Sequence, residues 1–303
     1  MNALLQHVLG MLLALHGCQA VPKAGLAWPN GPYVDISQFT TGGGISWYYT
    51  WSPESGNIAA DLEFVPMLWG YDQVADFSAN INQTIANNHV SHILAMNEPE
   101  QTAQSNMTPA EGAQMWQTYL EPLRAQGVLL GSPAPSSAPA GLTWIQDFLT
   151  ACNGGCTVDF IALHYYDVNA TAFQEYLENF YNTFQRPLWI TEWACENYNN
   201  VNAQCSPDDI VSFMNQTKGF MDSSSFVERY AWFGAMENMQ GVNPDDALMD
   251  SSGKINALGE QYIGTQMASN GSSSPGVTVS GGHSRTISWT MTAFAAFLGI
   301  SIS

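Results

Sequence analysis

The sequence predicts an α/β fold, a single (β/α)8 barrel, because eight apolar runs typical of strands alternate with segments typical of helices. The runs are rich in β-branched and aromatic residues and cover residues 25–28, 45–49, 63–69, 92–96, 128–132, 159–165, 188–193 and 227–233. Strands that alternate with helices form parallel sheets, and eight such units in about 250 residues match the size of this barrel. A doubly wound open sheet is the alternative, but no glycine-rich phosphate loop follows any of the runs.

Two of the expected helices begin with a clear start signal. Residues 108–111, TPAE, combine an N-cap threonine, a proline at the first helical position and a glutamate that reaches back, so a helix is expected to run to about Gly127. Residues 206–209, SPDD, repeat this pattern for a helix that ends near Asp222. Further helices are expected over 141–151, 170–184 and 257–267, whereas only short or irregular segments follow the first two strands.

Both ends of the chain resemble processing signals, which leaves residues 21–268 as the folded domain. Residues 1–20 hold an apolar stretch followed by CQA, which fits a secretory signal peptide, although no Lys or Arg precedes the stretch. A buried N-terminal helix is the alternative. Residues 269–285 form a Ser/Gly-rich linker and 286–303 a short hydrophobic tail, which together fit a glycosylphosphatidylinositol (GPI) anchor signal. A transmembrane helix is disfavoured because Ser, Thr and Gly dilute the tail.

The charge composition limits the possible partners. The chain has 7 Lys+Arg against 26 Asp+Glu, a net charge of -19, which repels nucleic acid and anionic membranes. Charged residues make up only 11% of the chain, whereas Ser, Thr, Asn, Gln and Gly are abundant. This composition suits a neutral, hydrogen-bonding partner. We expect a secreted or cell-wall monomer with no cofactor and no metal, which contacts a membrane only through the anchor.

Four cysteines remain after removal of the signal, an even number that suggests disulfides in an oxidising compartment. Proximity in the sequence favours Cys152–Cys156 and Cys195–Cys205, although four cysteines allow three connectivities. A zinc site is the alternative, but the six histidines show no ligand spacing near the cysteines.

Five N-glycosylation sequons add some weight to secretion, although chance supplies a few of them in a chain so rich in asparagine. They lie at Asn82, Asn106, Asn169, Asn215 and Asn270.

Polar and aromatic residues stand at the ends of the predicted strands, where a barrel of this type carries its active site. Asn97 and Glu98 end the fourth strand, Glu192 lies near the end of the seventh, and His164 and Tyr166 end the sixth. Tryptophans occupy the ends of four other strands, at Trp28, Trp47, Trp69 and Trp232. Aromatic rings pack on the C–H faces of sugars, and cleavage of a glycosidic bond requires a proton donor and a second carboxylate. The pattern therefore predicts a carbohydrate-cleaving site.

The motifs MNEPE, at 96–100, and LWITEWAC, at 188–195, resemble those of the retaining glycosidase clan of barrels. The segments AGLAWPN, ISWYYTWS, EFVPMLWG, DFIALHYYD and DSSGKINALGEQY extend this resemblance to glycoside hydrolase family 128, over about residues 24 to 268. Fungal members of the family are endo-β-1,3-glucanases, many of them attached to the cell wall. The resemblance thus implies an endo-β-1,3-glucanase whose partner is a neutral polysaccharide, β-glucan.

The resemblance also implies a role for each residue at the strand ends. Glu98 matches the acid/base and Glu192 the nucleophile, while Asn97 matches the residue that binds the sugar 2-hydroxyl in subsite −1. His164 and Tyr166 share strand parity, so both are expected to face the site and orient Glu192.

The aromatic platforms expected around the sugar are Trp232, as the floor of subsite −1, then Trp47 and Trp69. The chain departs from the clan in one respect: many members carry an arginine near the second strand, where this sequence has only Trp47, Tyr48 and Tyr49.

Less specific interpretations stay open at this stage. Asn97 and Glu100 have the spacing of a helix cap, and His164 could be a core histidine. Alternative functions are a transglycosylase, a glycosidase of another linkage such as β-1,4-glucan or mannan, and a non-catalytic glucan-binding protein.

Overall fold

The computed structural model describes residues 21–264. The predicted signal peptide, linker and anchor signal lie outside these residues, as does the Asn270 sequon.

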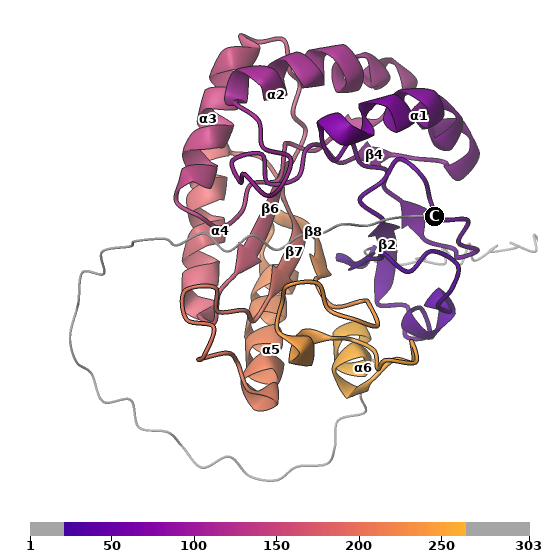
Figure 1. Cartoon of the computed structure of the whole chain (residues 1–303), viewed down its shortest axis with the longest axis vertical. Coiled ribbons are helices and arrows are strands. Elements are labelled where there is room, and N and C mark those ends of the chain that lie inside the picture. The colour runs from indigo at the N-terminus through magenta and orange to yellow at the C-terminus, as the bar shows by residue number, and fades with distance from the viewer. Residues whose placement is uncertain (1–20, 265–303) are drawn as a thin grey trace, which may run out of the picture.

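Eight parallel strands follow one another around a ring (Figure 1). Hydrogen bonds join six of them in the order β3-β2-β1-β8-β7-β6 and join β4 to β5. Two isolated parallel bridges, Met67–Leu94 and Gly131–Phe160, connect these two groups, so that each strand has a neighbour on both sides. The strands are β1 Ala24–Ala27, β2 Ile45–Tyr49, β3 Glu63–Phe64, β4 His92–Ile93, β5 Leu129–Leu130, β6 Ile161–Tyr166, β7 Leu188–Ala194 and β8 Val227–Trp232. The predicted α/β class with a parallel sheet is confirmed.

Helices lie outside the strands and follow six of them (Figure 1). They are α1 Val74–Asn88, α2 Pro109–Met115, α3 Ala140–Cys152, α4 Ala170–Phe184, α5 Pro207–Ser223 and α6 Ala257–Ile263, after β3 to β8 respectively. In the described part of the chain, β1 is followed by a short 3-10 helix, Ile36–Phe39, and β2 by no helix. The long helix expected over 108–127 is confirmed in three parts, because α2 continues as a π-helix, Trp116–Leu120, and a 3-10 helix, Glu121–Gln126.

The two predicted start signals form capping boxes. Thr108 accepts a hydrogen bond from the backbone N–H of Glu111, whose carboxylate accepts in return from the Thr108 backbone at 2.8 Å. Ser206 and Asp209 make the same exchange at the start of α5. Each box satisfies backbone donors that a helix terminus otherwise leaves unpaired.

The inside of the ring is filled by aromatic side chains in layers. Trp47, Tyr49 and Trp51 are two residues apart and stack along β2 and its continuation, with ring centroids 5.9 and 4.7 Å apart. The deepest of them, Trp47, lies 5.2 Å from Trp189 of β7, which in turn lies 4.4 Å from the Arg229 guanidinium. The interior near the start of the strands is therefore filled, and the opposite, C-terminal ends are where a barrel of this type carries its active site.

Both predicted disulfides, Cys152–Cys156 and Cys195–Cys205, are present. Among the described residues, no helix combines the length and apolar character needed to cross a bilayer.

Candidate active site

Glu98, His164 and Glu192 meet at the C-terminal ends of the strands. One side-chain atom from each residue lies within 4.8 Å of the other two. His164 Nδ1 is 2.9 Å from Glu98 Oε1 and 3.4 Å from Glu192 Oε2, so the imidazole lies between the two carboxylates. His164 and Glu192 are buried, whereas the Glu98 side chain keeps 12% of its surface exposed. The carboxylate that a substrate can approach more freely is thus Glu98.

Glu192 faces the interior because β7 contains an extra residue. Trp189 points into the ring, so regular alternation would send Thr191 and Trp193 inward as well. Instead Trp193 packs outward, where its indole N–H donates to Thr217 of α5 at 3.1 Å. The pairing of β7 with β6 and with β8 shifts by one residue at this point. This β-bulge turns Glu192 toward the site, as bulges beside active sites often do.

Glu98 is held by an unusual backbone conformation. Its φ of 38° is left-handed, a region that non-glycine residues adopt at a cost of about 1 kcal/mol or more and that is enriched at active sites. Its backbone N–H donates to Ala134 at 2.7 Å. The helix-cap interpretation of Asn97 and Glu100 is wrong, because no helix starts there. Instead Glu100 accepts from the backbone and hydroxyl of Ser136 at 2.7 and 2.6 Å and joins two loops.

Each oxygen of Glu192 accepts a short hydrogen bond from a neutral group. The Tyr166 hydroxyl donates to Oε2 at 2.5 Å, and the Trp51 indole N–H donates to Oε1 at 2.7 Å. The Tyr49 hydroxyl donates to the Thr191 carbonyl at 2.9 Å and lies 3.5 Å from Oε1. These contacts fix the direction in which Glu192 presents its oxygens.

No Lys or Arg of residues 21–264 forms an ion pair with Glu98 or Glu192, so burial has a large effect on the pKa values of the site. Burial raises the pKa of Glu192, against the lowering effect of His164 and of the hydrogen bonds from Tyr166 and Trp51. Burial also opposes the charged form of His164, but Glu192 and Glu98 outweigh it and raise the pKa of the imidazole. Groups that interact so closely titrate together, and this arrangement suits a site where one carboxylate holds a proton and the other does not.

The family model for the glycosyl hydrolase catalytic core matches residues 25–262, nearly the whole described domain. A solved exo-β-1,3-glucanase of Blastomyces gilchristii, from subgroup III of family 128, is 32% identical with a TM-score of 0.67. The match covers 80% of this chain and 97% of that one. The chain belongs to glycoside hydrolase family 128.

Two further relatives of this family-128 hydrolase are a solved endo-acting enzyme and a longer curated protein. A solved endo-β-1,3-glucanase of Amycolatopsis mediterranei, in complex with laminaritriose, is 29% identical with a TM-score of 0.65, over 81% of this chain and 98% of that one. Alkali-sensitive linkage protein 1 of Schizosaccharomyces pombe is 36% identical over 245 residues, 80% of this chain and 44% of the relative. The chain thus spans less than half of that curated relative.

Two of the predicted sugar platforms are misplaced. Trp47 lies on the expected inner face of β2 but is completely buried near the start of the strands, against Trp189. Trp232 is also completely buried and points outward, because it alternates with the inward Arg229. Its indole N–H donates to the Asp246 carbonyl. The next residue, Phe233, is the one that contacts the site.

The other predicted residues lie near Glu98 and Glu192. The backbone N–H of Asn97 donates to the carbonyl of Trp69, which is partly exposed and offers an aromatic surface beside Asn97 and Glu98. The Asn97 amide N–H donates to Gln104 at 3.2 Å, while its side-chain oxygen is buried without a hydrogen-bond partner. Of the pair expected to orient Glu192, Tyr166 makes its close hydrogen bond there, whereas His164 is closer to Glu98.

Sequence reasoning missed three aromatic residues at the site. Trp51 and Phe233 lie just beyond strand ends and contact each other at 5.9 Å. Strict alternation from Trp47 would have indicated Trp51. Tyr198 follows β7 in the loop closed by the Cys195–Cys205 disulfide; it is 48% exposed and its ring lies 5.7 Å from Tyr166.

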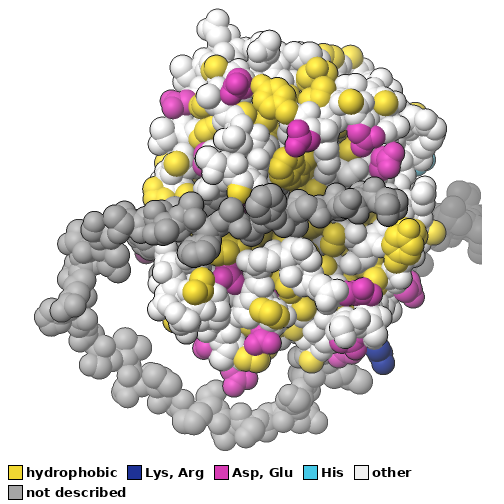
Figure 2. All heavy atoms as spheres, in the orientation of Figure 1, with side chains coloured by type: hydrophobic (Ala, Val, Ile, Leu, Met, Phe, Trp, Pro, Cys, Tyr) yellow, Lys and Arg dark blue, Asp and Glu magenta, His cyan; other side chains and the backbone are white. Residues whose placement is uncertain are grey.

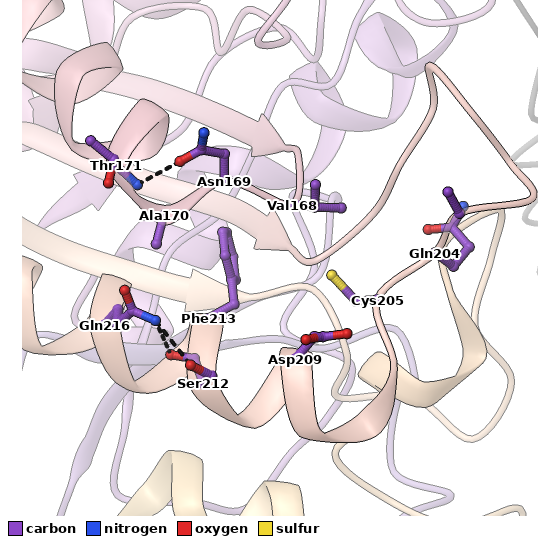
Figure 3. A pocket seen from close by; sticks show the side chains of 11 residues that line it. Val168, Asn169, Ala170, Thr171, Gln204, Cys205, Asp209, Ser212, Phe213 and Gln216 are labelled. Atoms are coloured by element: carbon purple, nitrogen blue, oxygen red, sulfur yellow. Dashed lines mark hydrogen bonds between the residues drawn. The ribbon is translucent and has the colours of Figure 1, made fainter. Parts of the chain in front are cut away.

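A surface cavity of about 540 Å³ lies between the starts of α4 and α5 (Figure 3), and neither Glu98 nor Glu192 lines it. Its polar side chains are mostly paired with near neighbours: Asn169 caps α4 through the Thr171 backbone, and Gln216 donates to Ser212. The cavity is thus separate from the chemistry. The described sequon asparagines Asn82, Asn106, Asn169 and Asn215 are all exposed.

Proposed function

We propose that this chain is a retaining hydrolase of β-1,3-glucan in the fungal cell wall, built on a (β/α)8 barrel. The observation that carries the proposal is the pair of carboxylates, Glu98 and Glu192, with oxygens within 4.8 Å of each other. Retaining glycosidases hold their two carboxyl groups about 5–5.5 Å apart, whereas inverting ones leave about 6.5–9.5 Å for a water molecule. The solved relatives act on β-1,3-glucan, which supports the choice of substrate.

In the first step, the Glu192 carboxylate attacks the anomeric carbon while Glu98 gives its proton to the leaving oxygen. The glycosidic C–O bond breaks, and an ester forms between Glu192 and the sugar. Tyr166 and Trp51 orient the attacking carboxylate through their hydrogen bonds. His164 Nδ1 contacts one oxygen of each glutamate and is placed to exchange a proton with either of them.

In the second step, Glu98 takes a proton from water, whose oxygen attacks the same carbon. The ester bond to Glu192 breaks, and the product keeps the configuration of the substrate. The net reaction adds one water molecule across one glycosidic bond. Asn97, Trp69 and the half-exposed Tyr198 are the proposed sugar contacts around this centre.

The stereochemistry of the first product tests the proposal. Proton NMR of the secreted domain acting on linear β-1,3-glucan oligomers should show a β-configured reducing end before mutarotation, and inverted product would contradict it. Glu98→Ala and Glu192→Ala should each abolish cleavage. Azide should rescue Glu192→Ala and yield a glycosyl azide of inverted configuration. Sedimentation with insoluble glucan without any sugar release by wild type would indicate a binding protein instead.

The cleavage pattern decides the finer activity. Endo action is the expected mode and releases oligomers of mixed length, whereas exo action releases one small product. Products longer than the substrate would identify a transglycosylase. A panel that includes β-1,4-glucan and mannan settles the linkage.

The proposed location is outside the cell, with the signal removed and the C-terminal tail exchanged for a GPI anchor. Asp and Glu side chains outnumber Lys and Arg on the visible face (Figure 2), and the abundance of Ser, Thr, Asn, Gln and Gly in the sequence supports an uncharged, hydrogen-bonding polymer as partner. The four exposed sequons are the proposed glycosylation sites of the described domain, together with Asn270. Mass spectrometry of the released protein would identify both the anchor and the glycans.

A further inference from the structure

The carboxylate of Glu192, the proposed nucleophile, is buried, and burial disfavours its charged form. Glu192 is 5% exposed, and no Lys or Arg of residues 21–264 forms an ion pair with it. Its close partners on Oε2, Tyr166 and His164, can both exchange protons with it. On Oε1 the close donor is the Trp51 indole at 2.7 Å, which has a proton to donate but no site to accept one.

The backbone of Trp51 is held in a position that it would not adopt on its own. Its φ of 55° is left-handed, a conformation that disfavours a bulky side chain. Gln73 stabilises it: the side-chain N–H₂ of Gln73 donates to the Trp51 carbonyl at 2.7 Å, and its oxygen accepts from the Trp69 backbone at 3.0 Å. One glutamine thus joins the loops after β2 and β3 and sets the position of the indole.

The Trp51 ring is also fixed by its neighbours. It packs 4.7 Å from Tyr49 and 5.9 Å from Phe233, and only 7% of the residue is exposed. A donor that is already oriented and shielded from water stabilises charge more strongly than one that must reorganise. The indole N–H of Trp51 is thus held against Glu192 in three ways: by the left-handed backbone, by the hydrogen bonds of Gln73 and by packing of the ring.

We propose that Trp51 is a catalytic residue, whose indole N–H favours the ionised form of Glu192 and aims its carboxylate at the anomeric carbon, and that Gln73 is its positioning residue. The inference rests on the proposed hydrolytic function. The hydrogen bond is strong to the carboxylate and weak to the ester, because the ester oxygen carries no full charge. Trp51 therefore also favours departure of Glu192 as a carboxylate in the second step.

Trp51→Phe tests the proposal, because it removes the N–H and keeps an aromatic ring. We expect kcat on β-1,3-glucan oligomers to fall about 10- to 100-fold, the range for loss of a hydrogen bond to a buried charge. The acid limb of the pH profile of kcat/KM should move to higher pH, because Glu192 loses a donor that favours its ionised form. Gln73→Leu should move both quantities in the same direction by less.

Trp28→Phe is the matched control. Trp28 is a buried tryptophan beyond the end of β1, and its indole N–H donates to the Gly31 carbonyl at 3.0 Å, away from both glutamates. This variant should lose comparable stability in thermal unfolding but keep the wild-type pH profile. An unchanged profile in Trp51→Phe, or an equal shift in Trp28→Phe, would overturn the proposal.

A measurement without substrate separates this inference from the proposed function. In protein labelled with 5-fluorotryptophan, the ¹⁹F resonance that disappears in Trp51→Phe should shift with pH in the wild type. It should not do so in Glu192→Gln. A resonance insensitive to pH in the wild type would refute the role of Trp51 even if the enzyme is active. Failure of the wild type to cleave any β-glucan would instead refute the proposed function.

Discussion

The two ends of the strand ring contain similar residues with opposite charge balance. Near the start of the strands, Glu63 Oε1 lies 2.6 Å from His92 Nδ1, and Glu63 Oε2 accepts from Arg229 at 2.5 Å. At the C-terminal ends, His164 likewise contacts a glutamate, but Glu192 stands where the first cluster has its arginine. Indole rings border both clusters, Trp189 at the first and Trp51 at the second.

This difference in charge reverses the pKa shift of the glutamate. Burial opposes ionisation of Glu63, but His92 and Arg229 outweigh it and lower its pKa, so Glu63 is a stable anion. Burial of Glu192, assisted by the nearby Glu98 charge, prevails over His164 and the two neutral donors and raises its pKa. A buried carboxylate that is paired with a cation, such as Glu63, is tolerated by the fold, and removal of its partner is destabilising. A buried carboxylate without a Lys or Arg partner, such as Glu192, costs stability and has the shifted pKa that is typical of functional sites. Substitutions at the two ends should therefore affect different properties.

Glu192→Gln should produce the largest effect, on activity alone. Without the nucleophile, kcat on β-1,3-glucan should fall by at least about 10⁴-fold, which corresponds to about 5.5 kcal/mol in transition-state stabilisation. The free energy of unfolding near pH 7 should stay constant or rise, because the change removes a buried charge that no cation balances. Kinetics and chemical denaturation of the same preparation would measure both.

The contrary outcome is informative as well. If Glu192→Gln loses more than about 2 kcal/mol of stability, Glu192 is a structural anion like Glu63 and the two ends do not differ in the way proposed. Glu63→Gln is the matched substitution at the other end. It should destabilise the protein and leave kcat per folded molecule close to the wild type.

Arg229→Met should produce the next largest effect, on stability. The guanidinium bonds to Glu63 and lies 4.4 Å over Trp189 and 5.7 Å over Trp47. Removal of the cation leaves a buried carboxylate uncompensated, which costs about 3–5 kcal/mol. Urea denaturation measures this loss, and kcat at a temperature where the variant is folded should stay within about twofold of the wild type.

The double variant Glu63→Gln/Arg229→Met separates charge from packing. It should recover part of the stability lost in Arg229→Met, since no uncompensated charge remains. If the single and double variants are equally unstable, the loss comes from packing of the arginine stem against the indoles, and the electrostatic comparison fails.

The same comparison explains which parts of the structure could be predicted from the sequence. Apolar runs and capping signals are local, so strand order and the starts of α2 and α5 follow directly. Glu98 could be proposed as a candidate because a carboxylate after a buried strand is unusual. The orientation of Glu192 depends on a bulge in β7 that no local pattern reveals. Trp51 depends on a left-handed backbone that a distant glutamine supports. Active sites concentrate such departures from local rules.

The failures with Trp47 and Trp232 have a different cause. Both assignments relied on a tryptophan lying near the end of its predicted strand. The assignment of Trp232 neglected which face of the strand the residue occupies, and that of Trp47 neglected how deep in the ring it lies. Arg229 fixes the parity of β8, so that Phe233 and not Trp232 faces the site. Trp47 has the right parity but lies four residues before Trp51, too deep to reach a substrate.

Asp246→Asn should produce the smallest of these effects, on the pH dependence of stability. Asp246 is another acid near the C-terminal ends that forms no ion pair with a Lys or Arg of residues 21–264. Its Oδ1 accepts from the Cys195 backbone at 3.3 Å, and its Oδ2 is buried without a hydrogen-bond partner among these residues. Burial raises its pKa from 3.8 to about 8, opposed by the Cys195 hydrogen bond and assisted by Glu196 and Asp245. In the unfolded chain the group ionises near its ordinary value. Its stabilising contribution is therefore complete below pH 3.8 and is lost as the pH rises toward 8.

The slope of this loss is about 1.4 kcal/mol per pH unit between those limits. Asp246→Asn removes the titration and keeps the acceptor, so the variant should gain about 2.7 kcal/mol relative to the wild type between pH 6 and 8. Urea denaturation across this range gives the difference directly, with Asp61→Asn as control because it makes the same charge change at an exposed position that does not contribute to the pKa shift of Asp246. A difference that does not vary with pH would mean that Asp246 is ionised in the fold. The C-terminal end would then tolerate buried charge as well as the arginine-balanced end does.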